Sequence, residues 1–401
     1  MPKDLLVFLG SGVSLESGLP SVEALTSAVL TGDYYESTRG PTTFASDPSL
    51  LLDAASVADV QKLLCLLGVL DQRYLQSSAP YATAGGYRYT GAVYRSATTY
   101  EDLFYLASQI AGRGIGLADD STTGAFMDVV EREAGKLLGG GCLEERLIAL
   151  ARMARRATSL IEHVVAKMLQ STAVKGLELI VELARSSHVG RLDVITLNHD
   201  ILLEQALVRA GITYADGFGL PDGDVRWRED AVYDRPDTKV RIVKPHGSID
   251  WFLFARNGGE QHAVVRNPSA VEHRSAHGEL LKMNRSTASF LTGVNKVAAY
   301  NQGTFSEMHF RCSELFRRHD RMIMSGYGWA DTGQSLRIDH WLDSDEIHSI
   351  LLFHRRPLEL RTRSLLVDQA YDYRVKSGQV VPVQKWLSEA SLSDVTDWLR
   401  K

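Results

Sequence analysis

The sequence predicts an α/β protein with a mostly parallel sheet, helices on both faces of that sheet, and a large helical insertion. Short apolar runs that end in polar residues occur near the start of the chain and again in its second half. Each is followed by a turn or by helical spacing, which is typical of the strand–helix units of an open parallel sheet. Between these runs, apolar positions at three- and four-residue spacing indicate helices over residues 50–75, 100–110, 125–138 and 143–169.

Length and composition set broad limits on what the chain can be. Its 401 residues can hold two or three domains of common size, or one domain with a large insertion. The formal net charge of -5 gives no overall basic character, so we expect no direct binding of nucleic acid. Three scattered cysteines suit a reducing compartment, and no apolar run is long enough for a signal peptide or a membrane span. We therefore expect a cytoplasmic protein that does not associate with membranes.

The first predicted strand, residues 4–9, is followed by a glycine-rich turn. Gly10 and Gly12 allow the backbone to approach a pyrophosphate closely, and Ser11 and Ser14 add hydroxyl groups. The next glycine, Gly18, follows Gly12 by six residues rather than by the three of dehydrogenases. A plain tight turn is an equally good interpretation of this segment alone. A helix is predicted over residues 22–30.

A second strand is predicted over residues 192–197, and a helix follows it. Asn198 and Asp200 then lie at the carboxyl end of a strand, where open α/β sheets bind ligands. Both residue types are also ordinary helix caps, so capping and a site role are equally good explanations here.

A third strand, residues 241–244, places His246 at its tip, beside Gly247 and Ser248. An isolated histidine is usually structural or exposed, but this position suits a general base.

The remaining elements are predicted from their periodicity. Within the helical region, Thr98 and Thr99 followed by Glu101 and Asp102 form an ordinary helix start that needs no catalytic explanation. We expect a loop or hairpin over residues 257–279, a helix from residue 305, a strand over 321–324, a helix through 339–342, a last strand over 350–353 and a short helix over 393–400.

Four motifs in this order resemble the sirtuin-like NAD-consuming family. The segment from Gly10 to Pro20 is similar to the family's Gly-Ala-Gly-x-Ser-x-x-Ser-Gly-Ile-Pro loop. Residues 196–200 resemble its Thr-Gln-Asn-x-Asp motif, and His246-Gly247 resembles its catalytic His-Gly. Residues 325–331, with Gly326, Tyr327 and Asp331, resemble the late loop that holds the adenosine side of the cofactor.

The departures from the family are also informative. Protein deacylases of this family continue the first loop with Asp-Phe-Arg, where this chain has Ser21-Val22-Glu23, and they carry two Cys-x-x-Cys pairs on a zinc ribbon. Cys65, Cys142 and Cys312 lie too far apart to supply four thiolates to zinc. The resemblance is thus closer to the zinc-free bacterial branch whose members hydrolyse NAD in anti-phage defence.

The resemblance implies a Rossmann-like fold and a set of site residues. Its catalytic residues are Asn198, which positions the ribose hydroxyl or a water, and His246, which is the base. Asp200 contacts the carboxamide of NAD, and no metal is needed. The remaining residues implied to bind the cofactor are Gly10, Ser11, Gly12, Ser14, Pro20, Gly326, Tyr327 and Asp331.

Domain organisation and partners follow from the same comparison. Residues 1–30 and 191–401 form the Rossmann-like catalytic domain, and residues 31–190 form a mainly helical insertion in place of the zinc ribbon. The resemblance implies an NAD-depleting effector with a HerA-type ATPase as partner, or alternatively a short Argonaute. Amphipathic helices that cannot all face one core indicate a homo-oligomer. Two other functions stay open: an NAD or ADP-ribose sensor without turnover, and, less favoured, a protein deacylase.

Overall fold

The computed structural model describes residues 2–32, 54–78, 97–113, 121–138, 141–222, 225–256, 262–266, 272–274, 280–283, 288–293, 296, 300–301, 303–363 and 365–400. Its central feature is a seven-stranded sheet whose neighbouring strands all run parallel. In spatial order, the strands are β13 (Val380–Val383), β12 (Ser349–Phe353), β11 (Arg321–Ser325), β1 (Lys3–Leu9), β2 (Val189–Thr196), β6 (Val240–Val243) and β3 (Tyr214–Ala215).

Strand β1 shows why both faces of this sheet are covered. Leu5, Val7 and Leu9 belong to one buried cluster, whereas Leu6 and Phe8 belong to another. Successive side chains of a strand point to opposite faces, so a continuous apolar strand requires helices on both. One face is covered by α7 (Glu178–Arg185), α8 (Leu202–Arg209) and α12 (Leu392–Arg400), and the other by α9 (Gly303–Arg318), α10 (Thr332–Ser344) and α11 (Leu365–Ser377). The predicted α/β fold is confirmed.

The order of the strands places a topological switch point beside β1. The chain passes from β1 to β2 on one side and later returns to the other side as β11. In open α/β sheets, ligands bind outside the carboxyl ends of the strands at such a point. The loops that begin at Gly10 and Gly326 follow these two strands directly.

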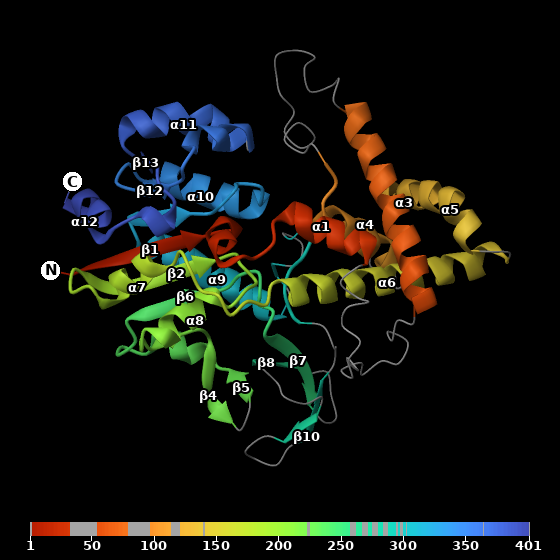
Figure 1. Cartoon of the computed structure of the whole chain (residues 1–401), viewed down its shortest axis with the longest axis horizontal. Coiled ribbons are helices and arrows are strands. Elements are labelled where there is room, and N and C mark those ends of the chain that lie inside the picture. The colour runs from red at the N-terminus through yellow and green to blue at the C-terminus, as the bar shows by residue number, and fades with distance from the viewer. Residues whose placement is uncertain are drawn as a thin grey trace.

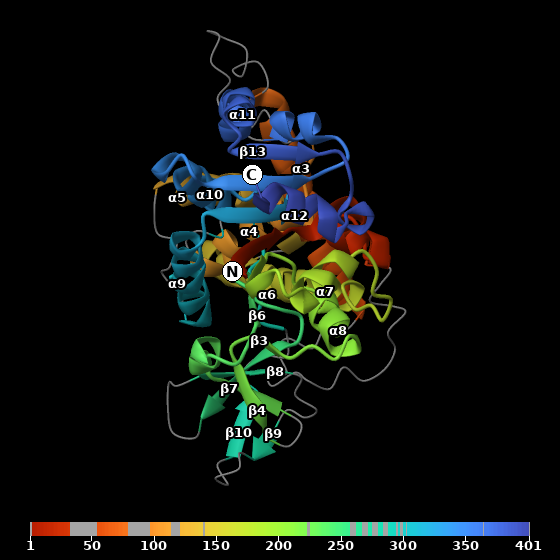
Figure 2. The same cartoon turned by 90° about the vertical axis from the view of Figure 1, so that its left-hand side faces the viewer.

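A second sheet was not predicted from the sequence. The expected loop or hairpin over residues 257–279 includes a true hairpin strand, but it belongs to a six-stranded antiparallel sheet beside the β3 end of the first sheet (Figure 2). Its strands, in spatial order, are β4 (Phe218–Asp222), β5 (Val225–Arg228), β8 (His262–Arg266), β7 (Trp251–Arg256), β10 (Leu280–Met283) and β9 (Glu272–Arg274). Phe254, Leu281 and Met283 form its small buried cluster.

The helical region packs around a core of its own. Its members are α1 (Val22–Thr31), α3 (Ala54–Ser78), α4 (Tyr100–Arg113), α5 (Ser121–Leu138) and α6 (Leu143–Met168). Figure 1 shows α3, α4, α5 and α6 on the side of the molecule opposite the two termini, with α1 between them and the sheet. Leu25 and Val29 of α1 and Phe290 share the core of these helices, so the region is anchored both to the first strand–helix unit and to the loop after the second sheet. Residues 50–53 of the expected first helix lie outside the described residues.

Two further differences from the predicted elements concern one edge of the sheet and the helix that precedes β2. The strand over residues 350–353 is not the last, because β13 pairs with β12 at the sheet's edge. Helix α7 falls within the range 31–190, yet its Leu179, Ile180 and Leu183 are buried against the sheet.

Among the helices that the structure describes, none combines the length and apolar character needed to cross a bilayer.

Candidate functional site

The glycine loop after β1 forms a 3-10 helix, η1 (Ser11–Ser17), packed directly against the loop after β11. The Gly10 amide donates to the Ser325 carbonyl at 3.0 Å, and the Gly12 amide donates to the Gly326 carbonyl at 2.9 Å. A Cβ on Gly10 would lie 2.6 Å from the Gly326 oxygen, and one on Gly12 would lie 2.8 Å from the Gly326 Cα. These glycines therefore let two backbones touch at the switch point, and their amides already have partners within the protein.

Gly326 is constrained in two ways. Its φ of +67° lies in the left-handed region, and a Cβ there would lie 2.5 Å from the Val13 nitrogen. Any other residue would be strained in conformation and would also collide with backbone.

Ser14, Asn198 and Asp200 form one buried hydrogen-bonded group across β1 and β2. The Ser14 hydroxyl donates to Asp200 Oδ2 at 2.7 Å, and Asn198 Nδ2 donates to the Ser14 hydroxyl at 3.0 Å. Asp200 Oδ1 also accepts from the Leu202 amide at 3.0 Å, at the start of α8. Asp200 thus accepts from an amide in the first turn of α8, whose N-cap residue is Ile201, and it also accepts from Ser14.

This arrangement leaves acceptor capacity at the site. The Asn198 side-chain oxygen, Oδ1, is buried and has no hydrogen-bond partner among the described residues. An unpartnered buried carbonyl costs about 1–3 kcal/mol unless a ligand or water donates to it. A carboxylate has about four lone-pair positions, so Asp200 can accept further donors. A ligand that presents N–H and O–H donors fits these two groups.

A buried ion pair holds the Asn198–Asp200 turn in place. Lys244, which follows β6, donates to the Asp200 backbone carbonyl and to Glu204 Oε1, the latter at 3.1 Å. The Lys244 and Glu204 side chains are 2% and 4% exposed. This contact fastens the end of β6 to the turn after β2, and therefore sets where His246 lies relative to Asn198.

His246 lies beside Asp331. Its Nε2 is 3.2 Å from Asp331 Oδ2, although the two are not aligned as a hydrogen bond. Burial lowers the pKa of His246, and the Asp331 carboxylate partly offsets this effect. Although burial alone would raise it, the pKa of Asp331 is lowered by His246, by Lys296 and by the Gln334 amide. The imidazole is thus held neutral beside a stable carboxylate.

Asp331 is held in place by hydrogen bonds from three residues, Gln334, Tyr300 and Tyr327. Its Oδ1 accepts from the Gln334 amide at 2.9 Å, which caps α10. The same oxygen accepts from the Tyr300 hydroxyl at 2.9 Å, and burial followed by the Asp331 charge raises the pKa of Tyr300. The Tyr327 hydroxyl donates to the Asp331 backbone carbonyl at 2.9 Å. Tyr327 itself is buried against Phe8, with ring centres 5.1 Å apart.

Two further histidines surround His246. The His199 and His309 ring centres lie 6.3 Å and 6.4 Å from that of His246, and Tyr300 stacks on His309 at 3.6 Å. Burial and Arg337 lower the pKa of His309 to about 3, and burial lowers that of His199 well below its usual value. We did not predict Tyr300 and His309 as site residues, because neither lies at a strand end or in a recognisable motif.

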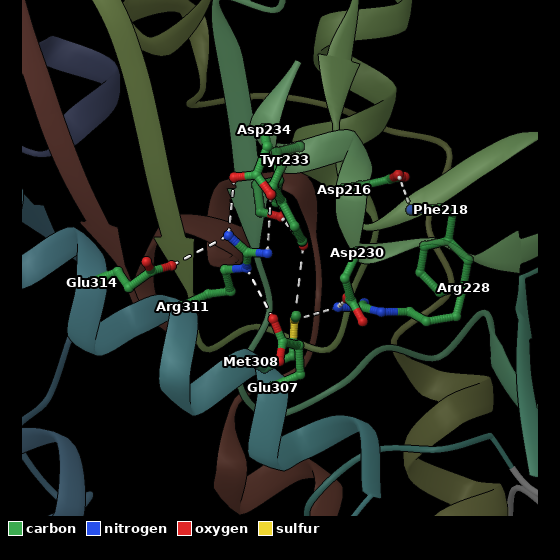
Figure 3. A network of polar contacts seen from close by, with 11 residues as sticks. Asp216, Phe218, Arg228, Asp230, Tyr233, Asp234, Glu307, Met308, Arg311 and Glu314 are labelled. Atoms are coloured by element: carbon green, nitrogen blue, oxygen red, sulfur yellow. Dashed lines mark hydrogen bonds and ion pairs between the residues drawn. The ribbon is translucent and has the colours of Figure 1, made fainter. Parts of the chain in front are cut away.

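Contacts at the other side of α9 fix this helix, and with it His309 (Figure 3). Arg311 binds Asp234, the last residue of the short helix η4 (Asp230–Asp234), at 3.2 Å. The Tyr233 hydroxyl lies 3.8 Å from the sulfur of Met308, the residue before His309. The segment between β5 and β6 therefore holds α9 against the sheet, and α9 presents His309 toward the strand ends.

The remaining predicted residues lie at the rim. Ser11 is exposed, and Pro20 is half-buried just before the Ser21 cap of α1. A cavity of about 250 Å³ lies beside η1, where the β1 and β11 loops meet, and it extends to Trp386 and Ser388. Neither Asn198 nor His246 lines it. Within the described residues, no group of three or more His, Cys, Asp or Glu side chains is placed to hold a metal.

Comparison of the sequence with protein-family models and with curated proteins finds no match. The resemblance to sirtuin-like enzymes therefore depends on the four motifs. All four contribute to the two buried groups described above, Ser14–Asn198–Asp200 and His246–Asp331. His246 belongs to the third motif and Asp331 to the fourth, so the contact between these residues brings the two motifs together.

Proposed function

We propose that this protein is an NAD glycohydrolase that cleaves NAD to nicotinamide and ADP-ribose. The observation that carries the proposal is that a neutral histidine beside a carboxylate and an amide with an unpartnered oxygen lie at adjacent strand ends of one parallel sheet. This combination supplies a base and an orienting group at the edge where such sheets bind ligands.

The reaction replaces the nicotinamide–ribose bond with a bond from the ribose carbon to a water oxygen. Nicotinamide leaves with the bonding electrons, and the attacking water loses a proton. Charge develops at the ribose carbon in an oxocarbenium-like transition state, so orientation of the water and of the leaving group governs the rate.

Each of the two buried groups has a part in this scheme. The free Asn198 oxygen accepts a hydrogen bond from the water or from a ribose hydroxyl, and Asp200 accepts from the carboxamide N–H. His246 takes the proton. With Nε2 facing Asp331, Nδ1 is the ring nitrogen that accepts it. Because the Gly10 and Gly12 amides are already used, the pyrophosphate would depend on Ser11 and on other groups of the loop.

The proposal extends to biological role and assembly. An NAD hydrolase that worked constantly would drain the cofactor of its cell, so its activity requires a control. By resemblance to two-gene defence systems, we propose self-association and a HerA-type ATPase partner, with a short Argonaute as the alternative. The surfaces proposed for these contacts are the helical insertion and the segment 370–401.

Product analysis tests the reaction. The purified protein, alone and assembled with its partner, is incubated with NAD, and the products are separated by chromatography. We expect nicotinamide and ADP-ribose in equal amounts, without any added peptide. Release that requires an acyl-lysine peptide would restore the deacylase, and tight binding of NAD without turnover in the assembled complex would establish a sensor.

A further inference from the structure

An ion pair connects the helical insertion to the surroundings of His246. Glu101, in the first turn of α4, lies with Oε1 2.7 Å from Lys296 Nζ. The two side chains are 27% and 12% exposed. The helix start itself depends on the next acid, since Asp102 accepts from both the Thr99 amide and the Thr99 hydroxyl. Glu101 is therefore not needed as a cap, and its carboxylate is directed to another part of the chain.

The segment that carries Lys296 is also attached to the His246 loop. The Leu291 amide donates to the His246 carbonyl at 2.8 Å, and Phe290 pairs with Gly247 in an antiparallel bridge. A few residues on, Gly293 approaches α4 so closely that a Cβ would lie 3.2 Å from the Phe104 ring and 3.6 Å from the Glu101 carbonyl. Residues 288–293 thus connect the histidine loop to the start of α4.

The charges of this pair act on the site. Burial has the largest effect on both groups, lowering the pKa of His246 and raising that of Asp331, and the direct contact between the two comes next; the Lys296 charge then lowers the pKa of each. The Glu101 charge acts in the opposite direction on His246 and raises its pKa. The pair therefore places two opposed charges near one imidazole, and the Glu101 charge partly offsets that of Lys296 only while α4 stays in position.

We propose that Glu101 and Lys296 are positioning residues that set the protonation of His246 according to the position of the helical insertion. The consequence of this inference, that a movement of α4 would control His246 as the catalytic base, rests on the proposed function. The effect of the ion pair on the pKa of His246 is a property of the folded chain and does not depend on cleavage of NAD.

The two halves of the pair should have opposite effects. In Glu101→Gln, the Lys296 charge is no longer offset, so the pKa of His246 should fall by about half a unit or more. In Lys296→Met, the opposing positive charge is gone, so the pKa should rise by about the same amount. The double variant should lie near the wild type. If the contact were purely structural, the pKa of His246 would shift in the same direction in both single variants.

Other titratable groups face His246 and stay constant in this comparison. They come from every element around it: Asp331, His199, Tyr300 and His309, with Arg337 beyond His309 and Lys244 behind Asp200. The conservative variants Glu101→Asp and Lys296→Arg keep both charges, and we expect the wild-type pKa from each. They also control for a folding defect in the charge-removing variants.

The test is an NMR titration of the histidine rings in the full chain, with the His246 signal identified by its loss in His246→Gln. Glu131→Gln is the matched control, because Glu131 pairs with Arg146 at 3.0 Å inside the same helical region. Opposite shifts in the two single variants, with none in the control, support the proposal. Shifts of one sign, no shifts, or an equal shift in Glu131→Gln overturn it. Because no substrate is used, a negative result is distinct from a failure of NAD cleavage.

In an active preparation, the acidic limb of the rate against pH should move in the same directions. It should lie at lower pH for Glu101→Gln and at higher pH for Lys296→Met, because a base acts only when unprotonated.

Discussion

Replacement of Lys244 by Met should destabilise the fold severely. Lys244 and Glu204 form a 3.1 Å ion pair with side chains 2% and 4% exposed, so removal of Lys244 takes its positive charge away from a buried carboxylate. Such changes cost about 3–5 kcal/mol in free energy of unfolding. Lys244→Met also removes the donor to the Asp200 carbonyl, which frees the turn that carries Asn198. The double variant Lys244→Met/Glu204→Leu should recover much of the loss, since no unmatched charge stays buried.

Urea unfolding followed by circular dichroism measures this effect. The slope of the unfolding free energy against urea concentration should be the same in the variants and the wild type. Lys62→Met is the matched control, because Lys62 pairs with Asp59 at 2.9 Å but the two side chains are 57% and 53% exposed. An exposed pair contributes at most about 1 kcal/mol. A loss in Lys244→Met as small as that of Lys62→Met would refute the view that this pair anchors the site.

Three further predictions concern the glycine loop, pH and assembly. Gly10→Ala should cost more unfolding free energy than Gly18→Ala, because a Cβ on Gly10 meets the Gly326 carbonyl at 2.6 Å, whereas Gly18→Ala is strained only by its φ of +78° and meets nothing within 4 Å; urea unfolding compares them. Burial lowers the pKa of His199, His246 and His309, so the unfolded chain takes up protons that the folded chain does not, and stability should fall below about pH 6.5 by up to ~1.4 kcal/mol per histidine per pH unit. Unfolding midpoints near neutral and mildly acidic pH measure this, and His309→Gln should weaken the dependence. Light scattering at micromolar concentration should detect an oligomer, and a fully active monomer would contradict the proposed assembly.

The parallel sheet and its strand-end residues could be predicted because their signals are local. Residues 4–9 and 192–197 are short apolar runs that end in polar groups, and both are central strands of the sheet. Helical spacing likewise predicted α4, α6 and α9. The second sheet was missed because its strands are short, and register between distant segments such as β5 and β8 depends on tertiary pairing rather than on local sequence.

Only those residues of the candidate site that come directly after a strand could be predicted. Asn198, Asp200 and His246 each follow a strand, so the sheet brings them to one edge. Tyr300, His309 and Lys296 come from a turn and a helix whose position depends on packing with α10 and η4, and no local pattern distinguishes them from core or surface residues. Glu101 shows the limit most clearly. Its place in a first helical turn explained it fully at the level of sequence, yet its carboxylate binds a lysine 195 residues further along the chain.

The most direct test of the account is the rate of NAD cleavage by Asn198→Ala and His246→Ala beside the wild type, each shown to be folded by circular dichroism and assembled in the same way. Both residues lie at strand ends rather than inside the sheet's apolar clusters, so the fold should survive either change. Loss of a base or an orienting group should reduce turnover by about a hundredfold or more in each variant. A near-wild-type rate in either variant would contradict the assignment of that residue, and in both it would contradict the proposed site as a whole.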